Sequence, residues 1–310
     1  MDIIKNLRIS ITTKCKQACW YCFNEGQNFT QISFEDMDGL RWLLGCLSRE
    51  FGTEIVRLTG GEPLEHPTPL EFARIAKQSG INKVGLTTNG RDFAKYSPLF
   101  EDFGVDDCAV HLWQLNGGTK INMSRVFDTM SDFKRLYAKT RFNIVLTRGN
   151  SPYVNKVICY AIKNGISLLI LDLLQAGVLE SDFKNEYYPL STLHTTLHEQ
   201  ALIETKDNIN VRVFTGSNMS IKLVDHYKDG LEPSSYCTQN LALNPLLLTP
   251  DFGLSYCTHF SNPTYSLSDA VRKKDLDQLR TVLMSVKQDL KDCNKCTKKF
   301  VLSDDWQLNS

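Results

Sequence analysis

Short apolar runs alternate with amphipathic helical patterns from residue 7 to about residue 173. Six of these runs are expected to be strands: Leu7–Thr12, Glu54–Leu58, Lys83–Thr87, Asp107–Leu112, Phe142–Thr147 and Ser167–Leu173. Repeated strand–helix units predict a parallel sheet with right-handed crossovers, covered by helices. Because six units are fewer than a closed eight-fold barrel needs, the expected fold class is α/β, a partial (β/α)6 TIM-like barrel.

Two of the helices between these strands have clear apolar faces. Ser33 is expected to cap the first, whose apolar positions recur at helical spacing at Met37, Leu40, Leu44, Leu47 and Phe51. The second is expected to begin near Ser124, with Val126, Met130, Phe133 and Tyr137 as its stripe. In parallel α/β folds the functional residues collect at the carboxyl ends of the strands, so polar residues there are the candidates for a site.

The alternation fails after about residue 215. A hairpin is expected from Leu246–Thr249 and Leu254–Tyr256, followed by a helix near Asp275–Leu290. We therefore divide the chain into a barrel domain, residues 1–215, and a small C-terminal auxiliary domain, residues 216–310. The limited apolar content of the second domain suggests that a metal stabilises it.

Composition and charge narrow the class of protein. The 310 residues are 42% hydrophobic and 23% charged, which is typical of globular chains. Thirty-five basic and thirty-five acidic residues balance, so no nucleic-acid partner is expected. The N-terminus does not resemble a signal peptide, and no apolar run approaches the ~20 residues that span a bilayer. The expected location is the cytoplasm, with no membrane partner.

The strongest chemical signal is a group of three cysteines that directly follows the first expected strand. Cys15, Cys19 and Cys22 have the spacing C-x3-C-x2-C. Three thiolates on one loop can hold three irons of a cubane cluster and leave the fourth iron without a protein ligand. The alternative is a set of buried or zinc-bound cysteines with a distant fourth partner.

Polar motifs also end the second and third expected strands. The second ends in RLTGGEP, where Gly60 and Gly61 allow close backbone approach and Glu62 offers an acceptor for a cationic amine. The third ends in LTTNG, which places Thr88 and Asn89 at the same edge. Each motif alone is also compatible with an ordinary turn, but three on successive strand ends are much more specific.

Together, RISITTKCKQACWYC, RLTGGEP and TTNG resemble the radical S-adenosylmethionine (SAM) superfamily. Their order and spacing are most similar to the branch that includes the molybdenum-cofactor GTP cyclase and its Twitch/SPASM relatives. The resemblance covers the barrel well and the C-terminal part more loosely. It implies a SAM-binding [4Fe-4S] cluster, reductive cleavage of SAM to a 5′-deoxyadenosyl radical, and abstraction of a hydrogen atom from a substrate.

The resemblance also implies residue roles. Cys15, Cys19 and Cys22 would hold the cluster, with Tyr21 beside the adenine of SAM. The residues that would contact the rest of SAM are Gly60, Gly61, Glu62, Thr88 and Asn89. A flavodoxin- or ferredoxin-type protein would supply the electron.

The last quarter of the chain holds a second set of cysteines: Cys237, Cys257, Cys293 and Cys296. Four thiolates saturate either a cluster or a zinc ion. The hairpin before Cys257, LLLTPDFGLSYC, resembles the Twitch/SPASM signature, which implies an auxiliary [4Fe-4S] cluster. A structural zinc ion is the alternative.

Two departures from the family pattern affect the substrate. Where the fourth strand of the family often reads V-S-L-D, this chain has His111 and Trp113, so His111 is a candidate catalytic or substrate residue; an aromatic pair packed in the barrel mouth is the alternative. Arg8, Arg57 and Arg141 occupy positions at which the cyclase directs basic residues toward anionic groups. Internal ion pairs are the alternative role for Arg8 and Arg57.

This chain has four C-terminal cysteines, and it lacks the arginine-rich stretch and the terminal Gly-Gly of the cyclase. We therefore predict that it does not make a molybdenum-cofactor precursor. The leading hypothesis is a radical SAM enzyme for a small molecule, anionic if the arginines bind it. The chain starts on the first expected strand, without a leader-binding module, which favours a small molecule. The first alternative is modification of a ribosomal peptide, by cross-linking or epimerisation. The second is a non-catalytic, iron–sulfur- or zinc-stapled binding protein or electron carrier.

Overall fold

The computed structural model describes residues 4–27, 30–116, 121–175, 178, 180–200, 202–208, 211–226, 246–255 and 265–292. The chain divides into two compact units. The first comprises residues 1–18, 23–108 and 237–296, and the second comprises residues 19–22, 109–236 and 297–310.

All six strands expected in the barrel are present. They are β1 (Asn6–Thr12), β2 (Ile55–Gly60), β3 (Lys83–Thr88), β4 (Asp107–His111), β5 (Thr140–Leu146) and β6 (Ser167–Asp172). Further along the chain are β7 (Ile203–Asn208), β8 (Val211–Thr215), β9 (Ser220–Val224), β10 (Leu246–Leu248), β11 (Gly253–Ser255) and β12 (Tyr265–Ser266). The predicted alternation of strand and helix is therefore confirmed up to β6.

The helices that follow these strands are α1 (Met37–Phe51), α2 (Glu71–Gln78), α3 (Phe93–Tyr96), α4 (Met123–Leu136), α5 (Ser151–Lys163), α6 (Glu180–Glu186), α7 (His194–His198), α8 (Ser268–Lys273) and α9 (Leu276–Asp292). Short 3-10 turns are η1 (Asn24–Gly26), η2 (Pro63–Glu65), η3 (Ser97–Leu99), η4 (Trp113–Leu115) and η5 (Leu190–Leu193).

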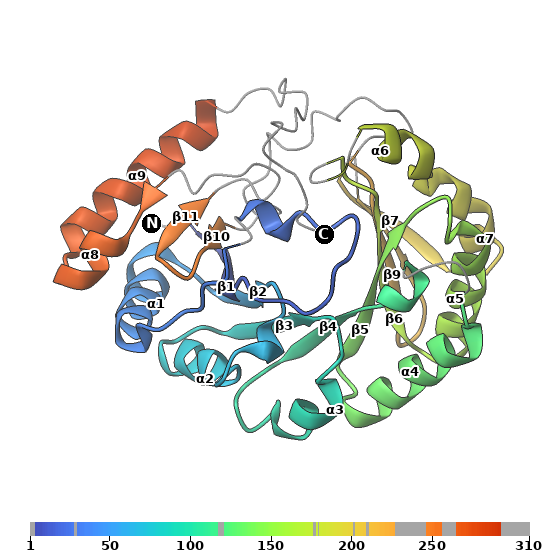
Figure 1. The fold of residues 1–310 in the computed structure, drawn as a ribbon, viewed down its shortest axis with the longest axis horizontal. Coiled ribbons are helices and arrows are strands. Elements are labelled where there is room, and N and C mark those ends of the chain that lie inside the picture. The colour runs from blue at the N-terminus through green and yellow to red at the C-terminus, as the bar shows by residue number, and fades with distance from the viewer. Residues whose placement is uncertain are drawn as a thin grey trace. The chain divides into compact units, whose positions relative to one another are not determined.

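The first unit is built on parallel pairing of β1 with β2 and of β2 with β3. The expected C-terminal hairpin is confirmed as β10 and β11, and β10 pairs in parallel with β1, so it extends the edge of this sheet. Helix α1 lies along β1 and β2 in Figure 1, and it buries Leu40, Leu43, Leu44, Leu47 and Phe51. The structure thus confirms the apolar face that the spacing predicts, although Met37 is only half-buried.

Helix α1 is capped by Asp36 rather than by Ser33, so the predicted cap is wrong. The Asp36 carboxylate accepts a hydrogen bond of 2.7 Å from the backbone N–H of Gly39. Ser33 pairs instead with Thr12 at the end of β1, and their hydroxyl oxygens are 2.8 Å apart. An N-cap side chain must accept a hydrogen bond from a free backbone N–H of the first helical turn, and Asp36 does so through Gly39. The cap therefore lies three residues after Ser33.

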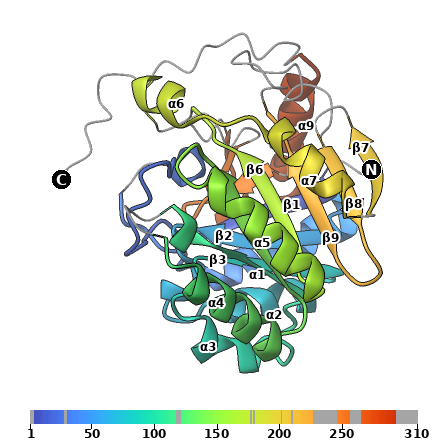
Figure 2. The ribbon, with the colours of Figure 1, turned by 90° about the vertical axis from the view of Figure 1, so that its right-hand side faces the viewer.

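The second unit continues the parallel arrangement through β5, β6 and β9. Strand β9 follows residue 215, so parallel pairing extends past the point at which the sequence pattern loses its alternation. Strands β8 and β7 then add in antiparallel order, and β7 is the edge strand of the described part of this unit. Helices α4 and α5 lie side by side along β5 and β6 (Figure 2). The rings of Phe127 and Tyr160 stack between the two helices, with their centroids 4.2 Å apart.

Strand β3 has a glycine where a side chain of β2 crosses it. Arg57 of β2 is in register with Gly85, and its guanidinium reaches over Gly85 to donate 2.6 Å to the Asp107 carboxylate. It also donates 3.2 Å to the carbonyl of Leu86. A methyl group at residue 85 would lie 2.4 Å from the guanidinium, so the absence of a side chain there allows this ion pair.

We predict that Gly85→Ala lowers the free energy of unfolding by about 1–3 kcal/mol, because the new methyl group displaces a half-buried guanidinium from its carboxylate. Urea unfolding measures this change. Gly45→Ala is the matched control, since its methyl group would meet only the flexible end of Arg49 and alanine favours a helix interior. An equal effect of both substitutions would show that the ion pair does not depend on Gly85.

Candidate functional site

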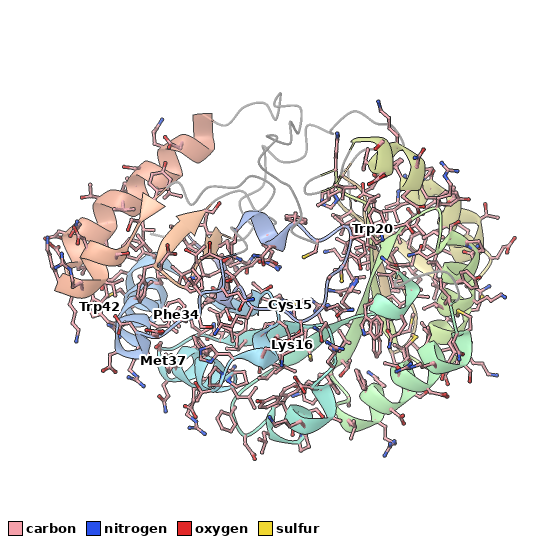
Figure 3. The ribbon with its side chains drawn as sticks, in the orientation of Figure 1. Cys15, Lys16, Trp20, Phe34, Met37 and Trp42 are labelled. Carbon is pink, nitrogen blue, oxygen red and sulfur yellow. The ribbon has the colours of Figure 1, made fainter. Side chains whose placement is uncertain are left out.

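The loop after β1 carries three cysteine thiols. Cys15 and Cys22 are exposed and Cys19 is half-exposed. Within the first unit, the sulfur of Cys15 accepts from the backbone N–H of Gln17 at 3.4 Å and lies 3.9 Å from the side-chain nitrogen of Asn89. Figure 3 places Cys15 and Lys16 away from α1, the helix that carries Trp42. Within the second unit, Cys22 N–H donates 3.0 Å to the carbonyl of Cys19.

The GGEP motif holds the start of this loop by direct backbone contact. Gly61 N–H donates 2.7 Å to the carbonyl of Thr12, and Glu62 N–H donates 2.7 Å to the carbonyl of Lys14. Gly60 has a φ of 135°, and a Cβ at Gly61 would lie 2.3 Å from the Lys14 carbonyl oxygen. Any side chain at these positions would therefore push the cysteine loop away from β2.

Glu62 is buried and joins the GGEP and TTNG motifs. Its carboxylate accepts 2.6 Å hydrogen bonds from the Thr88 hydroxyl and the Asn89 N–H, and one of 3.0 Å from the Leu64 N–H. Burial raises the pKa of Glu62 to about 7, although these three donors act in the opposite direction. The GGEP turn at the carboxyl end of β2 thus contacts the TTNG turn at the carboxyl end of β3 through Glu62.

Tyr21 and His111 form a close pair in the second unit. The Tyr21 hydroxyl is 2.5 Å from Nε2 of His111, and the ring centroids are 5.9 Å apart. Burial lowers the pKa of His111 to about 4, so its ring is neutral at pH 7. Burial and the neighbouring Cys19 raise the pKa of Tyr21 above its ordinary value. The Tyr21 hydroxyl therefore binds a neutral imidazole ring.

Arg8 and Arg57 have carboxylate partners in the first unit. Arg8 pairs with Glu25 and donates 3.2 Å to the Thr59 hydroxyl. Arg57 pairs with Asp107, which also lies 3.3 Å from Lys83. These are the ion pairs that the sequence left open as the alternative. Arg141 lies on β5, opposite Ser167 of β6, and is half-buried.

Several polar residues at strand ends have no motif in the sequence that marks them. Asp172, the last residue of β6, is buried, and both its carboxylate oxygens are bound by His226, through the ring Nδ1 and through the backbone N–H at 2.6 Å. Asn150 is also buried and donates 2.5 Å to the side-chain oxygen of Asn116. The available signal for Asp172 was a charged residue within the apolar run of the expected strand Ser167–Leu173, whereas Asn116 and Asn150 gave none.

The C-terminal cysteines, Cys237, Cys257, Cys293 and Cys296, lie outside the described residues. Their ligand role remains a prediction.

The donor set of the first loop fits an iron–sulfur cluster. All three side chains are thiols, the ligands that hold such clusters, and the backbone N–H of Gln17 points at the sulfur of Cys15. No three His, Cys, Asp or Glu side chains in the part of the chain that the structure describes converge on one point.

We predict that Glu62 makes stability depend on pH. Because its pKa is about 7 in the folded chain and near 4.5 when exposed, its protonated form contributes stability that is complete below pH 4.5 and is lost as the pH rises to 7. Relative to Glu62→Gln, the wild-type chain should lose about 3 kcal/mol across this range. Urea unfolding at several pH values measures the difference. Parallel curves for the two proteins would contradict the raised pKa.

Comparison with known proteins gives the same picture as the geometry. Residues 9–152 match the family model described as "Radical SAM superfamily". A "Probable GTP 3',8-cyclase" of Sulfurisphaera tokodaii is 26% identical over 286 residues, covering 87% of this chain and 86% of that protein. A "Probable GTP 3',8-cyclase" of Metallosphaera sedula is 27% identical over 290 residues, covering 88% and 86%.

Two solved structures share the fold. The structure of Streptococcus suis SuiB bound to S-adenosylmethionine has a TM-score of 0.61 at 14% identity, covering 92% of this chain and 68% of that one. The structure of anSMEcpe with bound AdoMet and a peptide has a TM-score of 0.55 at 18% identity, covering 94% and 86%. The α/β fold with parallel strands, as predicted, is that of these partial-barrel enzymes. None of the described helices is long and apolar enough to cross a membrane.

The family implies SAM and a [4Fe-4S] cluster as cofactors, and the thiols of the first loop and the buried carboxyl group of Glu62 suit them. Residues 9–152 of the chain are therefore a radical SAM domain.

Proposed function

We propose that this protein cleaves SAM reductively and uses the resulting radical to abstract a hydrogen atom from a small-molecule substrate. The observation that carries the proposal is the arrangement at the ends of β1, β2 and β3 in the first unit. There, the thiol of Cys15 contacts Asn89, and Asn89 binds the buried Glu62. A non-catalytic metal-stapled protein would not require a buried acceptor for an amine beside a cluster ligand.

The proposed cofactor is a [4Fe-4S] cluster on Cys15, Cys19 and Cys22, which when reduced supplies the electron that cleaves SAM to methionine and a 5′-deoxyadenosyl radical. Glu62 and the backbone of Gly60 and Gly61 bind the methionine ammonium group. A cation beside Glu62 favours the ionised carboxylate, so SAM binding releases the proton that burial retains on Glu62 near pH 7. Thr88 and Asn89 orient the carboxylate by donating hydrogen bonds to it.

For the substrate, we propose a small molecule whose anionic group faces Arg8, Arg57 and Arg141. Guanidinium groups match carboxylates and phosphates. Since Arg8 and Arg57 each hold a protein carboxylate, a substrate anion must displace Glu25 or Asp107, or share the arginine with it. The names of the relatives, which specify a GTP cyclase, support a small molecule with anionic groups.

We further propose that residues 216–310 form an auxiliary domain in which Cys237, Cys257, Cys293 and Cys296 hold a second [4Fe-4S] cluster. A fully ligated cluster suits electron transfer with the substrate radical, as in dehydrogenation, epimerisation or rearrangement. A flavodoxin- or ferredoxin-type protein is the proposed reductant of the enzyme.

The test is anaerobic reconstitution with iron and sulfide, followed by SAM and dithionite. The wild-type chain should form 5′-deoxyadenosine, and a Cys15→Ala/Cys19→Ala/Cys22→Ala variant should lose this activity, because its cluster has no ligands. Cys159→Ala is the matched control, since this exposed thiol lies on α5, and it should retain wild-type activity. Wild-type protein that forms no 5′-deoxyadenosine would contradict the proposed reaction.

Metal analysis of the same samples separates the cofactor alternatives. About eight irons per chain support two cubane clusters. About four irons and one zinc would contradict the auxiliary cluster and leave the SAM-binding one. The triple alanine variant should lose about half of the iron if both sites hold cubanes.

A further inference from the structure

Besides its contact with Cys19 in its own segment, the Tyr21 side chain binds two polar groups elsewhere in the second unit. Nε2 of His111, the last residue of β4, lies 2.5 Å from the Tyr21 hydroxyl. The side chain of Asn116, which directly follows η4, also makes a hydrogen bond with Tyr21. Tyr21, which lies between Cys19 and Cys22, is therefore held through its hydroxyl group. A phenylalanine at this position could not form these hydrogen bonds.

The second of these groups belongs to a rigid network. Asn116 donates 3.3 Å to the carbonyl of Val145 in β5 and accepts 2.5 Å from the side chain of Asn150. Asn150 is buried and also binds Val145 O at 2.8 Å and the Thr147 N–H at 2.9 Å. A satisfied buried network of this kind fixes the orientation of its members, so Asn116 is a firm anchor.

Apolar packing holds the ring of Tyr21 from the side. Tyr21, with Val145 and Leu174, packs against a buried cluster formed by Leu173, Val178, Phe183 and Tyr187. Residues 19–22 group with this unit, whereas residues 1–18 and 23–108 do not. Tyr21 thus contacts this unit through both polar and apolar groups.

From these contacts we infer that His111 and Asn116 are positioning residues: by binding the Tyr21 hydroxyl they fix the backbone of Cys19–Cys22 and so preorganise two cluster ligands. The inference rests on the proposed function, because it concerns the loop that would hold the SAM-binding cluster. It assigns His111 a role through Tyr21 in place of the substrate contact considered from sequence. Nε2 of His111 is already hydrogen-bonded to the tyrosine hydroxyl.

The test is a double-mutant cycle of Tyr21→Phe and His111→Leu. In the apo protein, iodoacetamide alkylation of Cys19, resolved by mass spectrometry, reports how firmly the segment is held. Each single variant should alkylate Cys19 about fivefold faster, the effect of one lost hydrogen bond, and the double variant should be no faster than either. Cys15 groups with the other unit, and its alkylation rate should stay unchanged as the internal control.

The reconstituted protein gives a second readout. Titration of the reduced cluster with SAM, followed by electron paramagnetic resonance, should show about fivefold weaker affinity in both single variants and no additional loss in the double variant. His111→Gln keeps an acceptor for the tyrosine and should restore both the alkylation rate and the affinity. Circular dichroism and the thermal midpoint verify that each variant is folded.

Additive effects of the two substitutions, or an unchanged Cys19 alkylation rate in folded Tyr21→Phe, would overturn the inference. A large loss in His111→Leu with a wild-type result in Tyr21→Phe would do so as well, because His111 would then act without the tyrosine. The alkylation experiment needs neither cluster nor SAM. Its result therefore stands apart from any failure of the proposed reaction.

Discussion

The site depends on the close approach of two backbones, Gly60–Gly61 after β2 and Thr12–Lys14 after β1. With hydrogen bonds of 2.7 Å between them and no space for a Cβ, the cysteine loop leaves β1 in a direction set by β2. The same contact fixes Glu62, whose carboxylate is then within reach of Thr88 and Asn89 at the end of β3. A contact made of main chain alone thus relates the loop of Cys15 to the buried carboxyl group of Glu62.

Two arginines of the first unit each form an ion pair with a carboxylate. Arg8 with Glu25 and Arg57 with Asp107 keep guanidinium groups half-buried without leaving them unbalanced. Removing one partner of such a pair costs more than the pair contributes, because the remaining charge is poorly solvated. The unit can therefore keep these two guanidinium groups half-buried within strands β1 and β2, with their charge compensated.

The sequence predicts the strands well, because each lies on a continuous apolar run, and it predicts the polar edge, because motifs directly follow those runs. It does not predict Asp36 over Ser33 as the cap of α1, since both residue types suit the position and only tertiary pairing of Ser33 with Thr12 decides between them. Strands β7, β8 and β9 are not among the expected strands, and the parallel pairing of β9 with β6 depends on residues distant along the chain. The partners of Arg8, Tyr21 and Asp172 are likewise distant in sequence, so no local pattern specifies them.

The pairing of Asp172 with His226 has a consequence for how the second unit opens. Both oxygens of a buried carboxylate are bound by one residue, and that residue lies just beyond the end of β9. If β9 separated from β6 at this end, the Asp172 carboxylate would stay buried but lose both of its hydrogen-bond donors. Leaving a buried charge unpaired in this way costs several kcal/mol of free energy. Thermal motion in the β7–β8–β9 segment should therefore be greatest at β7 and decrease toward β6, the strand that carries Asp172.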